Sequence, residues 1–107
     1  MSELSELELL GFFEVEPERD EFLLKYAVGD CSGVNLLFLY NPVEKYIQTT
    51  LRYGSDEVMA VSCDTISRAW IDGRVLHAEF TYTGGVVRLE LAVRPKLRIN
   101  WVGLRIA

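Results

Sequence analysis

The chain of 107 residues has little cysteine, a single histidine and no long apolar run. Cys31 and Cys63 stand 32 positions apart without a CxxC pair, which excludes a zinc site built from cysteines. The lone histidine, His77, excludes a metal site that needs several imidazoles. No apolar run approaches the ~20 residues that a membrane helix requires. We therefore expect no metal and no membrane partner.

The N-terminus indicates a cytoplasmic protein. The first six residues contain Glu3 and Glu6 and no base, whereas a secretory signal begins with a basic segment. In the cytoplasm Cys31 and Cys63 are expected to be free thiols rather than a disulfide. The length is typical of one domain, and no linker or internal repeat interrupts the chain, so we expect a single domain over residues 1–107.

The clearest structural signal lies between residues 65 and 106, which predict an antiparallel meander. Apolar and polar residues alternate in the runs 74–82, 86–94 and 97–106, as in a sheet with one buried face. Asp72-Gly73 and Gly84-Gly85 stand between these runs, and such pairs favour hairpin turns. The alternation places Leu97, Ile99 and Trp101 in the core. It also places Trp70 in the core, on the same face of its strand as Ile66.

The first half of the chain predicts a short helix followed by further strands. Ser5 and Glu8 have the spacing of a capping box, which favours a helix over residues 2–10 that ends at Gly11. Strands are predicted at 12–16, 22–28, 34–40, 58–63 and 66–71, with a turn at 17–20. Residues 43–53 fit either a strand or a helix that begins after Asn41 and Pro42.

These patterns together predict a mainly β protein that borders on α+β. We expect seven or eight antiparallel strands in one curved sheet or half-barrel, with the short N-terminal helix on its concave side.

Few residues suggest catalysis. His77 could form a dyad with Cys31 or Cys63, but no local signature surrounds either cysteine, so a strand histidine is the favoured interpretation. Glu79 and Glu90 could act as acid and base on neighbouring strands. Cross-strand ion pairs, Glu79 with Arg88 and Glu90 with Arg98, explain them better. Gly84-Gly85 lacks the residues of a phosphate loop. We therefore expect no enzyme and no cofactor.

The charge distribution disfavours nucleic acid as a partner. The net charge is −5, although the last two strands carry bases and an aromatic residue: Arg94, Lys96, Arg98, Trp101 and Arg105. The bases and the tryptophan are predicted to lie on opposite faces, and phosphate binding needs a basic protein.

Acidic residues, in contrast, are concentrated near the N-terminus, where residues 1–30 hold nine acids and two bases. Five of them form the densest group: Glu14, Glu16, Glu18, Asp20 and Glu21. Asp56, Glu57 and Asp72 lie in predicted turns and could extend this group. Such a surface can dock a basic protein. It can also be a solvated outer strand that discourages pairing between edges. Calcium binding is disfavoured because the EF-hand spacing is absent.

In size, acidity, predicted β-meander and lack of a catalytic set, the whole chain resembles a bacterial immunity protein of the contact-dependent growth inhibition kind. The resemblance implies a cytoplasmic inhibitor that binds a basic toxin domain, often a nuclease, and covers its active site. The eight acids named above would then be the binding residues, and those of 14–21 would mimic phosphates. Two alternatives stay open. One is a ligand-binding or enzymatic β-barrel lined by Tyr26, Tyr46, Trp70 and Tyr82, and the other is a subunit that associates through a strand edge.

Overall fold

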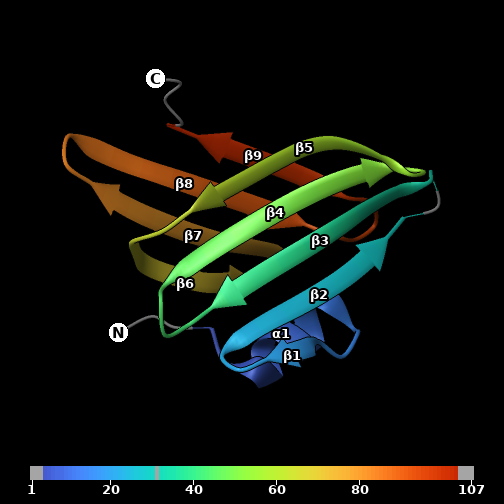
Figure 1. The fold of residues 1–107 in the computed structure, drawn as a ribbon, viewed down its shortest axis with the longest axis horizontal. Helices are drawn as coiled ribbons and strands as arrows, with labels where there is room; N and C mark the ends of the chain where they lie inside the picture. The colour runs from blue at the N-terminus through green and yellow to red at the C-terminus, as the bar shows by residue number, and fades with distance from the viewer. Residues whose placement is uncertain (1–3, 31, 104–107) are drawn as a thin grey trace.

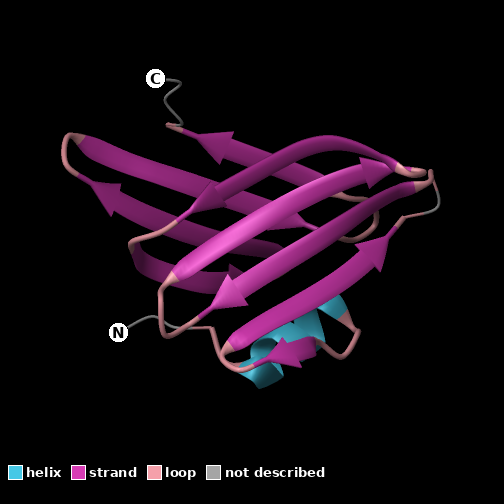
Figure 2. Ribbon diagram, in the orientation of Figure 1, coloured by secondary structure: helices cyan, strands magenta, loops and turns pink. Residues whose placement is uncertain are grey.

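The computed structural model describes residues 4–30 and 32–103, which contain one helix and nine strands (Figure 1). In chain order they are α1 (Glu6–Phe13), β1 (Glu18–Asp20), β2 (Leu23–Gly29), β3 (Val34–Asn41), β4 (Tyr46–Tyr53), β5 (Asp56–Cys63), β6 (Ile66–Asp72), β7 (Val75–Tyr82), β8 (Gly85–Ala92) and β9 (Arg98–Val102). Strands make up most of the chain (Figure 2), so the prediction of a mainly β fold with a short N-terminal helix is confirmed.

The strands form two antiparallel meanders instead of one curved sheet. Sheet A has the order β1-β2-β3-β4-β5, and sheet B has the order β6-β7-β8-β9. In Figure 1, sheet B lies behind sheet A, and α1 lies near β1 and β2. The chain leaves sheet A after Cys63, and Thr65 adopts a positive φ of 61°. This turn redirects the chain, so that β6 begins a new ladder with β7 and leaves β5 at an edge.

The core lies between the sheets and beneath α1. Tyr26, Phe38 and Thr49 are paired in register across β2, β3 and β4, so they share one face of sheet A. Thr49 Oγ1 accepts a hydrogen bond of 3.1 Å from the indole N–H of Trp101 in sheet B. The ring of Phe13 from α1 stacks on Tyr26, with ring centroids 4.8 Å apart. The helix and sheet B therefore cover the same face of sheet A.

The predicted faces of the last three strands are confirmed. Side chains of β7 and β8 that alternate along the strands are fully buried: Leu76, Ala78, Phe80, Leu89 and Leu91. In and before β9, Leu97, Ile99 and Trp101 are partly buried and pack against the core. An alternating sequence suffices here because both hairpins keep their register.

Helix α1 has the predicted capping box but different bounds. Ser5 is the N-cap and exchanges hydrogen bonds with Glu8. The helix continues past Gly11 to Phe13, so the predicted strand at 12–16 is wrong. Phe12 and Phe13 are both buried. Adjacent side chains of a strand point to opposite faces, whereas a helix can bury both on one broad face.

Two other segments of sheet A were assigned only in part by the sequence. Residues 17–20, predicted to be a turn, contain β1, which pairs with β2. The ambiguous segment 43–53 holds strand β4, which pairs with β3 and β5. The side-chain oxygen of Asn41 accepts hydrogen bonds from the backbone N–H groups of Val43 and Glu44. These bonds close the turn before β4, where the sequence alone also allowed a helix to begin.

A bulge in β6 moves Trp70 out of the core position predicted for it. Ile66 pairs with the buried Phe80, but the next paired residue is Arg68, opposite Glu79. One extra residue in the strand reverses the alternation, so Trp70 pairs with His77 on the outer face. The prediction that Trp70 shares a face with Ile66 is therefore wrong.

Cys63 is a buried free thiol, and Cys31 lies outside the described residues. Burial raises the pKa of the Cys63 thiol, and a hydrogen bond with Tyr82 opposes this shift. Within 4–30 and 32–103, no helix is long and apolar enough to cross a membrane.

Candidate protein-binding surface

The acids of residues 14–21 lie along one edge of the molecule, beside α1. Glu14 is the C-cap residue of α1. Glu16 follows in the connection to β1, Glu18 and Asp20 belong to β1, and Glu21 lies in the turn to β2. All five are exposed, and β1 is an edge strand of sheet A.

Only one of these five carboxylates is bound within the protein. Glu14 forms an ion pair of 3.3 Å with Arg94. The other four carboxylates have no hydrogen bond or ion pair with any residue that the structure describes: Glu16, Glu18, Asp20 and Glu21. We call these four residues the acidic edge. Arg19 lies among them but binds Glu6, with one Nη1–Oε1 distance of 2.8 Å, so the base is already occupied.

The structure does not bring Asp56, Glu57 and Asp72 to the acidic edge. All three are exposed. Asp56 and Glu57 begin β5, which is the opposite edge strand of sheet A, with β2, β3 and β4 between. Asp72 ends β6 in sheet B. The eight predicted binding residues therefore occupy three separate places.

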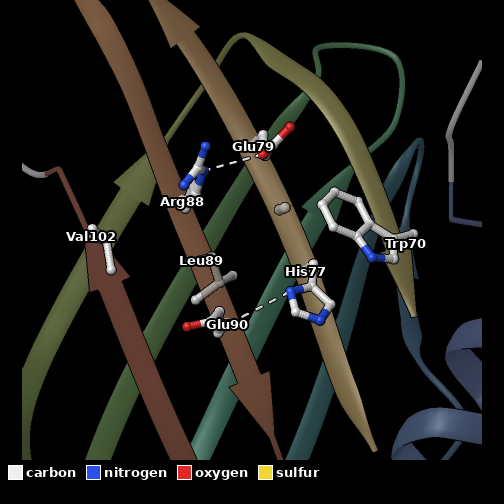
Figure 3. Close-up of a pocket in the computed structure, with 8 residues that line it drawn as sticks. Trp70, His77, Glu79, Arg88, Leu89, Glu90 and Val102 are labelled. Atoms are coloured by element: carbon white, nitrogen blue, oxygen red, sulfur yellow. Dashed lines mark hydrogen bonds and ion pairs between the residues drawn. The ribbon is translucent and has the colours of Figure 1, made fainter. Parts of the chain in front are cut away.

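A second charged region, of which the sequence predicted the Glu79–Arg88 pair but not the ring cluster beside it, lies on the outer face of sheet B (Figure 3). Side chains of β6, β7, β8 and β9 border a shallow hollow of about 300 Å³, with Trp70, His77 and Val102 on its walls. The rings of Trp70 and His77 are stacked, with centroids 4.9 Å apart, and the guanidinium of Arg68 lies 4.2 Å from the centre of the Trp70 ring. This cluster could not be predicted from the sequence without knowing that β6 contains a bulge, because the bulge places Trp70 on the same face as His77.

The acids of this outer face are paired. Glu79 lies between Arg88, at 3.2 Å, and Arg68, at 3.8 Å, so the predicted Glu79–Arg88 pair is confirmed. Glu90 accepts a hydrogen bond of 3.1 Å from Asn100 and lies 3.9 Å from His77.

The predicted pair of Glu90 with Arg98 is wrong. The register of β8 with β9 sets Asn100 opposite Glu90 and Arg98 opposite Ala92. The sequence predicted both strands but left the register between them open, and the register decides which polar side chain meets Glu90.

The residues considered for catalysis or ligand binding do not converge. His77 lies on the outer face of sheet B, whereas Cys63 is buried in the core. Tyr26 is also in the core, and Trp70 and Tyr46 line different depressions. In the described part of the chain, no three His, Cys, Asp or Glu residues are grouped so that they could hold a metal ion.

Comparison with known proteins gives one informative similarity. No protein-family model and no curated protein matches the chain. Among solved structures, the chain is similar to one described as a contact-dependent growth inhibition toxin–immunity protein complex from Klebsiella pneumoniae 342. The identity is 30%, the alignment covers 94% of this chain and 94% of that chain, and the TM-score is 0.82.

Proposed function

Because the chain belongs to the immunity proteins of contact-dependent growth inhibition systems, we propose that it binds a toxin domain in the cytoplasm and neutralises it. The support is the similarity to a chain of a toxin–immunity protein complex over 94% of both lengths. In this role the protein is an inhibitor that acts by occupying a surface of the toxin, and it needs no catalytic group of its own.

We further propose that the acidic edge is the part that contacts the toxin, and that the toxin domain is basic and a nuclease. Nucleases bind the phosphates of their substrates with Lys and Arg side chains. The four carboxylates of the acidic edge are exposed, close together in the chain and unpaired within the described residues. They would meet such bases in place of phosphates and block the access of nucleic acid to the active site. The unpaired state of these carboxylates is the observation that carries this proposal.

This arrangement predicts how the acids divide their effects. Acids at the rim of an interface mainly raise the association rate, and salt screens their attraction. Acids that lose their water against Lys or Arg of the toxin slow dissociation instead. None of the four is expected to support the fold, because each side chain is exposed and has no ion pair with a residue of 4–30 or 32–103.

The experiment replaces the four acids together: Glu16→Gln, Glu18→Gln, Asp20→Asn and Glu21→Gln. The probe is the purified toxin domain of the same contact-dependent growth inhibition system. We expect the dissociation constant to rise by about a hundredfold or more, roughly 2.7 kcal/mol. The association rate should also lose most of its dependence on ionic strength. The stability should change by less than about 0.5 kcal/mol per site in a denaturant titration.

A matched control changes the net charge equally at other exposed positions: Glu44→Gln, Asp56→Asn, Glu57→Gln and Asp72→Asn. We expect a small decrease in association rate from the altered long-range field and little change in dissociation rate. If the control loses binding while the acidic-edge variant keeps it, the docking surface lies around Asp56, Glu57 and Asp72. If the wild-type chain does not bind the toxin domain at all, the proposed function is wrong.

A further inference from the structure

Arg94 connects sheet B to the end of α1. It follows β8 in the connection to β9, more than 80 positions from the helix. Its Nη2 atom donates to the carbonyl oxygens of Phe12 and Gly11, at 3.4 Å for Gly11. The same atom lies 3.3 Å from a carboxylate oxygen of Glu14. One guanidinium therefore contacts the last turn of α1 and its C-cap residue.

A cation is favourable at this end of the helix. The last carbonyl groups of a helix have no partner inside it, and they form the negative end of its dipole. The last turn of α1 contains no basic residue. Arg94, in the connection between β8 and β9, supplies the positive charge and the hydrogen-bond donors that the last turn of α1 lacks.

The acidic edge begins at Glu16, two residues after Glu14, the last residue that Arg94 contacts. Glu14 has a left-handed conformation with φ of 59°, and it turns the chain from α1 toward Glu16. Val15 packs against the core. Farther along, Arg19 of β1 binds Glu6 in the first turn of α1. The segment that bears the acidic edge is thus held by an arginine near each end.

We propose that Arg94 is a positioning residue for toxin binding, because it fixes the direction in which the chain leaves α1 and so holds the acidic edge in the shape that the toxin binds. This inference rests on the proposed function. Arg94 touches none of the four acids of the acidic edge; it acts through Gly11, Phe12 and Glu14.

The proposal also gives Glu14 a role different from that of the other acids. Its charge is balanced by Arg94, so it is part of the support and not of the contact surface. A preorganised segment saves the entropy that ordering its side chains would otherwise cost on binding. Without Arg94 the segment would have to become ordered on binding, and the affinity for the toxin should fall.

The test compares Arg94→Ala with Arg98→Ala in binding to the purified toxin domain of the same contact-dependent growth inhibition system. Arg98 is exposed at the start of β9, and its side chain has no hydrogen bond or ion pair with another described residue, so both variants remove one positive charge. Charge alone would make both variants more acidic and speed their association with a basic toxin. If Arg94 positions the acidic edge, Arg94→Ala should instead weaken toxin binding by about three- to tenfold, whereas Arg98→Ala should not weaken it.

Two further variants separate positioning from general damage to the fold. Arg94→Lys keeps the cation and one or two donors, so we expect it to restore at least half of the lost binding free energy. Glu14→Gln keeps the contacts of Arg94 with the carbonyl groups, so we expect binding within about twofold of wild type. If Arg94→Lys binds no better than Arg94→Ala although both fold, or if Glu14→Gln weakens binding as much as the four-acid replacement, the proposal is wrong.

A double-mutant cycle gives the decisive readout. If Arg94 acts through the acidic edge, then in the variant that lacks the four acids Arg94→Ala should change binding no more than Arg98→Ala does, because only the long-range effect of the charge is left. An equal loss in both backgrounds would overturn the positioning role. Toxin binding that depends on the four acids, together with Arg94→Ala behaving like Arg98→Ala, would leave the proposed function intact and refute only this inference.

Discussion

The outer face of sheet B and the acidic edge are both exposed and charged, yet their carboxylates are in opposite situations. On sheet B, Glu79 lies between two arginines, and Glu90 contacts Asn100 and His77. At the acidic edge, four carboxylates have no partner among the described residues. Acid content alone thus does not distinguish the two regions, whereas the presence of internal partners does, and this difference is the reason for proposing the acidic edge as the binding surface.

The difference also bears on the cost of binding. A cation that approaches Glu79 must compete with Arg68 and Arg88, so a new ion pair there replaces an existing one. A cation that approaches Glu18 or Asp20 displaces only water. Since the net gain from an ion pair is small when an old pair is lost, these energetics favour the acidic edge over sheet B as the docking surface that we propose for a basic toxin.

The largest expected effect tests how much of the stability of sheet B comes from its outer face. Trp101→Ala should cost about 3–5 kcal/mol, because it opens the core and removes the hydrogen bond to Thr49. Trp70→Ala should cost only about 1 kcal/mol, since it removes the stacking with His77 and the contact with Arg68 on the outer face. Denaturant unfolding of the two variants measures both. Equal losses would mean that the outer face stabilises the fold as much as the core does.

The two tryptophans also show where the sequence sufficed for the fold and where it did not. Trp101 continues an unbroken alternation with Leu97 and Ile99, so its face could be predicted. Trp70 follows the bulge after Ile66, and a single extra residue reverses the face of every residue after it. The division into two sheets was missed for a similar reason, since it depends on the positive φ of Thr65. Local irregularities of this kind leave little trace in hydrophobic periodicity.

A smaller effect compares the acids directly. Glu79→Gln should cost up to about 1 kcal/mol, because Glu79 is only 19% exposed and its loss leaves two guanidinium groups close together. Glu18→Gln should change the stability by no more than about 0.3 kcal/mol. Thermal and denaturant unfolding at low and at high salt measure both, and only the Glu79 variant should depend on salt. If Glu18→Gln is equally destabilising, the acidic edge has internal partners and the contrast between the two regions fails.

The candidate surface could be predicted from the sequence only in its composition. The cluster of acids between Glu14 and Glu21 is visible in the chain, but its division into bound and unbound carboxylates is not. That division depends on Arg94, which lies 80 positions from Glu14 in the sequence and contacts it only in the folded structure. The sequence suggested Asp56 and Asp72 only as a possible extension of this cluster, and sheet order, which the sequence does not reveal, places them at other edges.

The smallest effect concerns Asp30, an acid of the same N-terminal third that nevertheless has internal partners. Its carboxylate accepts hydrogen bonds from the hydroxyl and backbone N–H of Ser32 and, at 3.4 Å, from the N–H groups of Val34 and Leu97. These bonds, that of the Ser32 hydroxyl first, hold the pKa of Asp30 below its usual value against the opposing effect of desolvation.

A folded-state pKa below the unfolded value means that ionised Asp30 stabilises the fold above the unfolded pKa of about 3.9. That contribution is lost as the pH falls through the folded-state pKa. Asp30→Asn should therefore be less stable than wild type at pH 7, by a small amount because Asp30 is only partly buried and water still reaches its carboxylate. The difference should shrink below about pH 4, and urea unfolding at a series of pH values measures it. A difference that stays constant down to about pH 3 would mean that the charge of Asp30 adds nothing to its hydrogen bonds. The charge of Asp30 would then stabilise the fold no more than the charges of the acidic edge do. Internal hydrogen bonds would in that case not distinguish the acids that stabilise the fold from those proposed to bind a partner.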